Sequence, residues 1–98
     1  HIDRFQILAD PTRRRVVDAL ANGERQVNDI VQAVGIHQSG VSRHLKILLD
    51  TGFVTVRPDG QRRLYALKPD PFREYRKLWE DRLDRFGATL ESRQDNRT

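Results

Sequence analysis

The sequence contains neither cysteine nor methionine among its 98 residues. Without thiols the chain cannot form disulfides, bind metals through thiolates or carry out thiol redox chemistry. No apolar run approaches the roughly 18 residues that a membrane span requires, and no signal peptide is visible. The chain starts at His1, so we expect a trimmed form of a longer protein. A single domain of this size has a modest core, for which help from a second subunit is expected.

The sequence also lacks the groups of residues that catalysis requires. It shows no nucleophile paired with a base, no metal-binding cluster and no phosphate-binding loop. His37 and His44 share one side of a predicted helix but are seven residues apart. That spacing is about 10 Å along the helix axis, too far for one metal ion to bind both unaided. We therefore predict no enzyme, no metal site and no cofactor, and we interpret His44 as a packed structural residue.

Charge is unevenly distributed along the chain. Residues 1–37 hold five residues of each sign, and residues 69–98 hold seven of each sign. Residues 38–68 hold six basic residues against two acidic ones, which equals the whole net charge of +4. A surface that binds a polyanion concentrates positive charge in this way, so the middle third of the chain is the predicted binding region.

The stretch over residues 38–52 predicts a short helix with two different faces. At about 100° per residue, one face is apolar, with Val41, Leu45, Leu48 and Leu49. The opposite face carries amide, hydroxyl and cationic groups, at Gln38, Ser39, Ser42, Arg43 and Lys46. Such groups can hydrogen-bond base edges and phosphate oxygens in a DNA major groove. We interpret this segment as a DNA recognition helix.

Three short helices are predicted before it. The first ends before Asp10, which is placed to cap the second helix, and Pro11 suits that helix's first turn. The third runs from about Asn28 to a stop at Gly35, and only three residues separate this stop from Gln38. Helix, tight glycine turn and helix form the helix-turn-helix arrangement, in which the first helix braces the second on DNA.

A β-hairpin is predicted after the recognition helix. Residues 53–57 and 62–67 are rich in β-branched and aromatic residues, and Pro58-Asp59-Gly60 separates them as a turn. Arg57, Arg62 and Arg63 lie near this turn, where a wing can reach a phosphate backbone or minor groove. The alternative is that these charges only protect edge strands from pairing with another chain.

The longest helix is predicted from Asp70-Pro71 to about Leu90. It has an apolar stripe that is too long to be buried in so small a core, so we expect it to pack on a second copy together with the N-terminal helix. The predicted dimer contacts are Phe5, Leu8, Phe72, Tyr75, Trp79, Leu83 and Phe86. The predicted architecture is mainly α: about five helices plus a two-stranded wing over residues 1–91, with a disordered tail over 92–98.

With these elements placed, the sequence resembles the ArsR-type (arsenic-repressor-like) winged helix-turn-helix regulators over roughly residues 5–90. The resemblance lies in the segments LADPTRRRVVDAL, GIHQSGVSRHLKILLDTGFV and RPDGQRRLYAL. It implies a cytoplasmic homodimeric repressor that binds a two-fold DNA operator. By position it implies base contacts from Gln38, Ser39, Ser42 and Arg43, and phosphate contacts from Lys46 and the wing arginines.

Three departures from the family pattern bear on function. His37 stands where a capping Ser or Thr is usual, and imidazole is a poorer cap. Gly40 replaces a common helix former, at a cost near 1 kcal/mol. The cysteines and the late histidines that metal-sensing members use are absent, so we expect a small-molecule or protein inducer, or none. The rival function is an architectural DNA-binding or RNA-binding winged helix without operator specificity, against which Gln38, Ser42 and Arg43 favour base reading.

Overall fold

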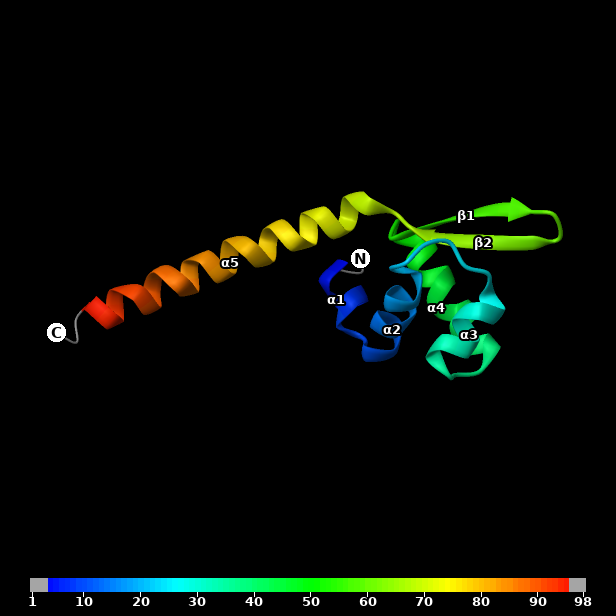
Figure 1. The fold of residues 1–98 in the computed structure, drawn as a ribbon, viewed down its shortest axis with the longest axis horizontal. Coiled ribbons are helices and arrows are strands. Elements are labelled where there is room, and N and C mark those ends of the chain that lie inside the picture. The colour runs from blue at the N-terminus through cyan, green and yellow to red at the C-terminus, as the bar shows by residue number, and fades with distance from the viewer. Residues whose placement is uncertain (1–3, 96–98) are drawn as a thin grey trace.

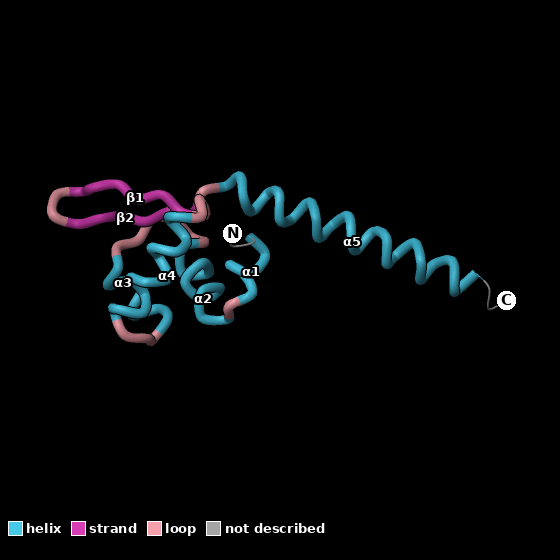
Figure 2. The backbone as a smooth tube through the Cα atoms, turned by 180° about the vertical axis from the view of Figure 1, so that it is seen from behind, coloured by secondary structure: helices cyan, strands magenta, loops and turns pink. Residues whose placement is uncertain are grey.

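The computed structural model describes the backbone over residues 4–95 and side chains over residues 6–87. Its elements in chain order are α1 (Arg4–Ala9), α2 (Pro11–Leu20), α3 (Val27–Val34), α4 (Gln38–Asp50), β1 (Val54–Asp59), β2 (Arg62–Leu67) and α5 (Pro69–Asp95). Figure 1 shows α1 to α4 packed into one head, from which the β-hairpin and α5 extend in opposite directions. Figure 2 shows the same arrangement from behind. The predicted class, five helices with a two-stranded wing, is confirmed.

Local sequence signals determine where the head helices begin and end. Asp10 caps α2, since its side chain accepts a hydrogen bond from the Arg13 backbone N–H at 3.0 Å, and Pro11 occupies the first turn. Both roles were predicted. Gly35 ends α3 in the left-handed conformation, with φ 76°, which a residue with a Cβ adopts only at a cost. The chain therefore reverses within three residues and α4 starts at Gln38.

The core of the head is formed by every element from α1 to β1. Its buried apolar side chains are Ile7, Leu8, Val16, Leu20, Ile30, Val34, Val41, Leu45, Leu48, Phe53 and Val54. Phe53 also contacts Phe72 of α5 edge-to-face, with the ring centroids 5.3 Å apart. This cluster holds α4 against α2 and α3 and leaves the other side of α4 to solvent.

The β-hairpin is a regular antiparallel pair in which Asp59 lies opposite Arg62. Gly60 and Gln61 form the two-residue turn, and Gly60 has φ 62°. A glycine at this first central position is what a type II′ hairpin turn requires. The predicted turn at Pro58-Asp59-Gly60 was wrong in its bounds, because Pro58 and Asp59 pair with β2 as the end of β1. On its other edge β2 is bridged by Arg25, from the connection between α2 and α3, which pairs with Tyr65. The wing is thus attached to the head through β2.

Helix α5 begins at Pro69, one residue before the predicted start, so Asp70 lies in its first turn. It continues to Asp95, past the predicted end near Leu90. The boundary predicted between 91 and 92 therefore falls inside this helix, and residues 96–98 of the predicted tail lie outside the described residues. In the part of the chain that the structure describes, no helix combines the length and the apolarity that crossing a membrane requires.

Candidate nucleic-acid interface

Helix α4 presents one polar face to solvent. All five side chains predicted for DNA contact are exposed on it: Gln38, Ser39, Ser42, Arg43 and Lys46. The opposite face is buried through Val41, Leu45 and Leu48, as predicted. Leu49 was assigned to that buried face, but it is 36% exposed because it lies at the border of the two faces. The two-faced helix is therefore present, with cations and neutral hydrogen-bonding groups available to a partner.

The amino-terminal end of α4 is capped by His37. Its Nδ1 accepts a hydrogen bond from the Ser39 backbone N–H at 3.1 Å, and the Ser39 Oγ lies 2.8 Å from the same nitrogen. A backbone N–H can only donate, so this cap requires the unprotonated Nδ1. Imidazole thus performs the role for which a Ser or Thr was expected, and it also holds Ser39 at the start of the exposed face.

Gly40 is explained by the packing of the turn that precedes α4. A Cβ added to Gly40 would lie 3.3 Å from the Cδ1 atom of Ile36, closer than ordinary van der Waals contact. The glycine therefore lets Ile36 cover the first turn of α4. A side chain at this position would require Ile36 to shift by a few tenths of an ångström.

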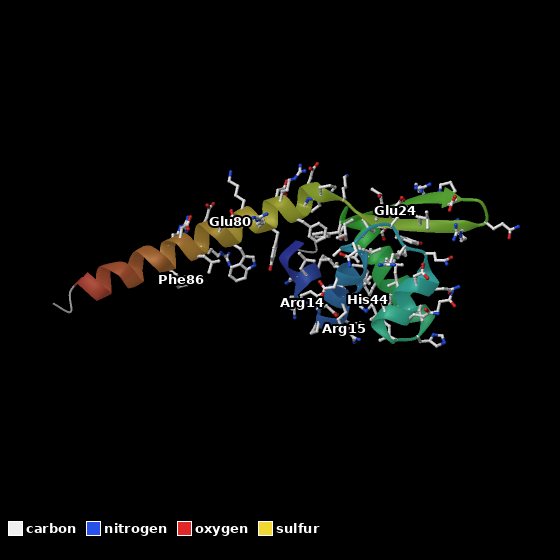
Figure 3. All side chains as sticks on the ribbon, in the orientation of Figure 1. Arg14, Arg15, Glu24, His44, Glu80 and Phe86 are labelled. Atoms are coloured by element: carbon white, nitrogen blue, oxygen red, sulfur yellow. The ribbon has the colours of Figure 1, made fainter. Side chains whose placement is uncertain are left out.

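His44 is the buried polar residue of α4, with 6% of its surface exposed. Figure 3 shows it inside the head, where α4 faces α2. Burial lowers the pKa of His44 below its ordinary value of 6.5, Arg13 and Arg43 lower it further, and Asp10 opposes them. Its Nδ1 has no hydrogen-bond partner among the described residues. The predicted structural role is supported by this burial, although not by a hydrogen bond at Nδ1.

The three wing arginines have different surroundings. Arg57 makes a bidentate ion pair with Glu24, through Nε to Oε2 at 2.6 Å and NH2 to Oε1 at 3.0 Å. Arg62 pairs with Asp59 across the turn at 2.7 Å. Arg63 is exposed and forms no ion pair within the described part of the chain. Of the three wing arginines, only Arg63 offers to a phosphate a guanidinium without an ion pair in the part of the chain that the structure describes.

A hollow of about 380 Å³ joins the wing to the start of α4. It is lined by Gln26, Val27 and Asn28 at the start of α3, by Gln38, and by the wing residues Gln61, Arg62, Arg63 and Tyr65. Gln26 precedes α3 without a side-chain hydrogen bond to its first turn, so the backbone N–H groups there lack a side-chain cap. Free N–H groups, amides and two arginines suit a phosphate oxygen. Sequence reasoning missed Gln26, Asn28 and Gln61, because only the folded chain brings them together.

The residues predicted for the dimer interface divide into two groups. Leu8 is buried in the core of the single chain, and Phe72 and Tyr75 pack against that core. Trp79, Leu83 and Phe86 are 44%, 59% and 64% exposed, and so is Leu78, at 45%, which the sequence analysis did not name. Trp79 and Phe86 line a hollow of about 470 Å³ with Arg82 and Arg85. Figure 3 shows Phe86 on the part of α5 that projects from the head. The side chain of Phe5 lies outside the described residues.

No group of three or more His, Cys, Asp or Glu side chains is placed to hold a metal ion within the described residues. His37 is an exposed cap and His44 is buried on the core side, so the two histidines do not form a pair. What the fold brings together is a basic and amide-rich surface over α3, α4 and the wing. A helix-turn-helix followed by a basic hairpin defines a winged-helix DNA-binding protein.

Comparison with known proteins identifies the family. Residues 10–56 match the model for the bacterial regulatory protein arsR family. The chain is 33% identical over 96 residues to the HTH-type transcriptional regulator Rv2034 of Mycobacterium tuberculosis, covering 94% of this chain and 90% of that protein. It therefore belongs to the ArsR family of transcriptional regulators, which are not enzymes.

Solved structures agree with this assignment. The crystal structure of a possible transcriptional regulator for arsenical resistance superposes with a TM-score of 0.75 at 37% identity, covering 90% of this chain and 96% of that one. The homodimeric winged helix-turn-helix domain Mb0332 of Mycobacterium bovis gives a TM-score of 0.67 at 32% identity, over 82% of this chain and 74% of that one. A probable mercury resistance operon repressor of Streptomyces lividans is 41% identical over 63 residues, 64% of this chain and only 50% of the repressor's length.

Proposed function

We propose that this chain is a homodimeric transcriptional repressor that binds an inverted-repeat DNA operator in the bacterial cytoplasm. The observation that carries the proposal is the hollow that is lined both by Gln38 of α4 and by Arg62 and Arg63 of the wing. Because one surface holds both base-reading and phosphate-binding groups, helix and wing can engage the same stretch of duplex.

The exposed side chains of α4 have separate roles in this proposal. Gln38, Ser39, Ser42 and Arg43 contact base edges in the major groove, and Lys46 contacts phosphate. Arg62 and Arg63 contact phosphates from the wing, with Arg62 exchanging its pairing with Asp59. Arg57 is left out of the contact set because Glu24 occupies two of its donors.

The dimer forms through α5. A single chain leaves Leu78, Trp79, Leu83 and Phe86 exposed, and a second copy of the same helix is the partner that a two-fold repressor supplies. The homodimeric state of Mb0332, which shares the fold, supports this arrangement. Two recognition helices would then lie about 34 Å apart, one turn of DNA.

The signal that releases DNA, where there is one, is a small molecule at the dimer interface or a protein partner. Similarity to a mercury resistance repressor does not transfer mercury sensing to this chain, because soft metals require thiolate ligands and the sequence contains no cysteine.

Selection of bound duplexes from a random pool tests the proposal. We expect an inverted repeat whose half-sites are centred about one helical turn apart. Binding is then measured against random duplex DNA and double-stranded RNA as competitors at fixed salt. Competition by random DNA or RNA as effective as by the selected operator would instead support an architectural DNA-binding or RNA-binding module.

A further inference from the structure

The Glu24–Arg57 ion pair joins two parts of the chain that are far apart in sequence. Its partners are 33 residues apart, with Glu24 in the connection between α2 and α3 and Arg57 on β1. Residue 25 pairs with β2, and β2 pairs with β1, so the ion pair crosses the full width of β2. Figure 3 shows Glu24 where the head meets the base of the wing. The pair thus connects the outer strand of the wing directly to the head.

Arg25, the residue after Glu24, is held both by its backbone and by its side chain. The Arg25 N–H donates to the Tyr65 carbonyl at 3.0 Å, and the Tyr65 N–H donates to the Arg25 carbonyl at 2.9 Å. The Arg25 Nε donates to the carbonyl of Ala19 in α2 at 2.9 Å. Because this backbone is fixed to both α2 and β2, the Glu24 carboxylate has a defined position from which to hold Arg57.

The charges around the pair favour this arrangement. The hydrogen bond from Arg57 lowers the pKa of Glu24, while Asp59 raises it. The same hydrogen bond raises the pKa of Arg57. Both side chains are substantially solvent-exposed, so the pair alone contributes little to the stability of the fold. Its consequence is geometric, since it restricts the angle between wing and head.

We propose that Glu24 is a positioning residue for DNA binding, which through Arg57 holds the wing at the angle where Arg62 and Arg63 reach phosphate. This inference rests on the proposed DNA-binding function. It reverses the role predicted for Arg57, which becomes a bridge within the protein instead of a phosphate contact. The opposite possibility is that Glu24 competes with phosphate for Arg57. The two possibilities predict opposite changes in operator affinity for Glu24→Gln.

The experiment compares Glu24→Gln, Arg57→Gln and the double variant on the selected operator across a range of salt concentrations. We expect each single variant to weaken binding about three- to fivefold, and the double variant to be no weaker than either, because both remove the same interaction. The slope of log K against log salt should stay the same. The charge-reversed variant, with Glu24→Arg and Arg57→Glu, should recover most of the affinity.

Two control variants calibrate these results. Arg73→Gln removes a guanidinium from another exposed ion pair, with Asp70 at 3.4 Å on α5, and should leave affinity unchanged. Arg63→Gln should lower the salt slope by about 0.9, as the loss of one phosphate contact does. Tighter binding by Glu24→Gln would overturn the proposal, because it would show competition with phosphate. The proposal would also be overturned if Arg57→Gln lowered the slope of log K against log salt while Glu24→Gln bound the operator with unchanged affinity.

Hydrogen exchange in the free protein separates this inference from the proposed function. Loss of the ion pair should speed exchange of the Arg25 and Tyr65 amides, which hold the wing to the head, without any DNA present. Exchange unchanged in both single variants would refute a positioning role even if the chain binds DNA. Faster exchange in both single variants, together with a wild-type chain that selects no operator, would support the wing contact and refute the DNA-binding function.

Discussion

Replacing Phe86 with serine should separate the two chains of the proposed dimer. Phe86 is 64% exposed in the single chain. With roughly 200 Å² for an aromatic side chain, about 130 Å² of its surface is available for burial. At about 25 cal/mol per Å², burial of that area contributes roughly 3 kcal/mol. A two-fold interface contains Phe86 twice, so Phe86→Ser should cost up to about 6 kcal/mol, or roughly 10⁴-fold in the dimer dissociation constant.

The fold of the single chain should be unaffected, because Phe86 contributes no buried core surface. Lys77→Ser is the matched control. It places the same residue in the same helix, but Lys77 lies about 200° around the helix from both Tyr75 and Trp79. Phenylalanine and serine have similar helix propensities and lysine has a higher one, so the control loses more helix propensity than Phe86→Ser does. A dimer that persists in Lys77→Ser therefore shows that loss of helix propensity is not what separates the chains.

Sedimentation equilibrium measures the dissociation constant of each variant, and operator titration measures the loss of DNA affinity that follows from it. Phe86→Ser should sediment as a monomer at concentrations where wild type and Lys77→Ser are dimers. If Phe86→Ser changes the constant less than tenfold while its helical content is retained, the interface does not include this part of α5.

Other expectations concern the head. Arg43→Ala should lose about 1–3 kcal/mol of discrimination at one base pair, whereas Arg63→Ala should weaken all sequences alike; identical behaviour would contradict the division between helix and wing. Because the pKa of His44 is lowered in the folded chain, its contribution to unfolding free energy should be complete above pH 6.5 and lost as pH falls below that value. Denaturant titrations at pH 7 and pH 5 should show that the unfolding free energy falls less between these two pH values in His44→Leu than in wild type. An equal fall in both proteins would contradict this role of His44. His37→Ala should cost about 1 kcal/mol in the same titration by removing the cap of α4, and no change would make the cap energetically neutral. Micromolar zinc at fixed ionic strength should leave operator affinity unchanged, and a tenfold loss would show a metal site.

Local signals were enough to predict most of the architecture. The Asp10-Pro11 pair, the glycine at 35 and the glycine at 60, between two runs of β-branched and aromatic residues, each determine backbone geometry within a few residues. The start and exposed face of α4 follow from such signals too. These features depend on hydrogen bonds and steric limits between neighbours in the chain, which the sequence displays directly.

What could not be predicted depends on contacts between distant residues. A basic residue near a hairpin turn has the same pattern whether it binds phosphate or a carboxylate 33 residues away, as Arg57 does. Periodicity placed Leu8 and Phe72 on the apolar faces of their helices. It did not show that the single chain already packs both residues in or against its own core. The exposure of Leu78 likewise follows from how little of α5 the head covers.

In the proposed dimer, the short contact between the head and α5 determines how the two recognition helices are spaced. The core contacts α5 through Phe72 and Tyr75, and the exposed apolar side chains begin at Leu78 and Trp79, about one helical turn later. That turn therefore sets the orientation of each reading head relative to the two-fold axis. Adding one alanine between Tyr75 and Trp79 would rotate each head by about 100° and shift it by about 1.5 Å. A dimer of such chains would still assemble, yet its two recognition helices would no longer face the same side of the DNA.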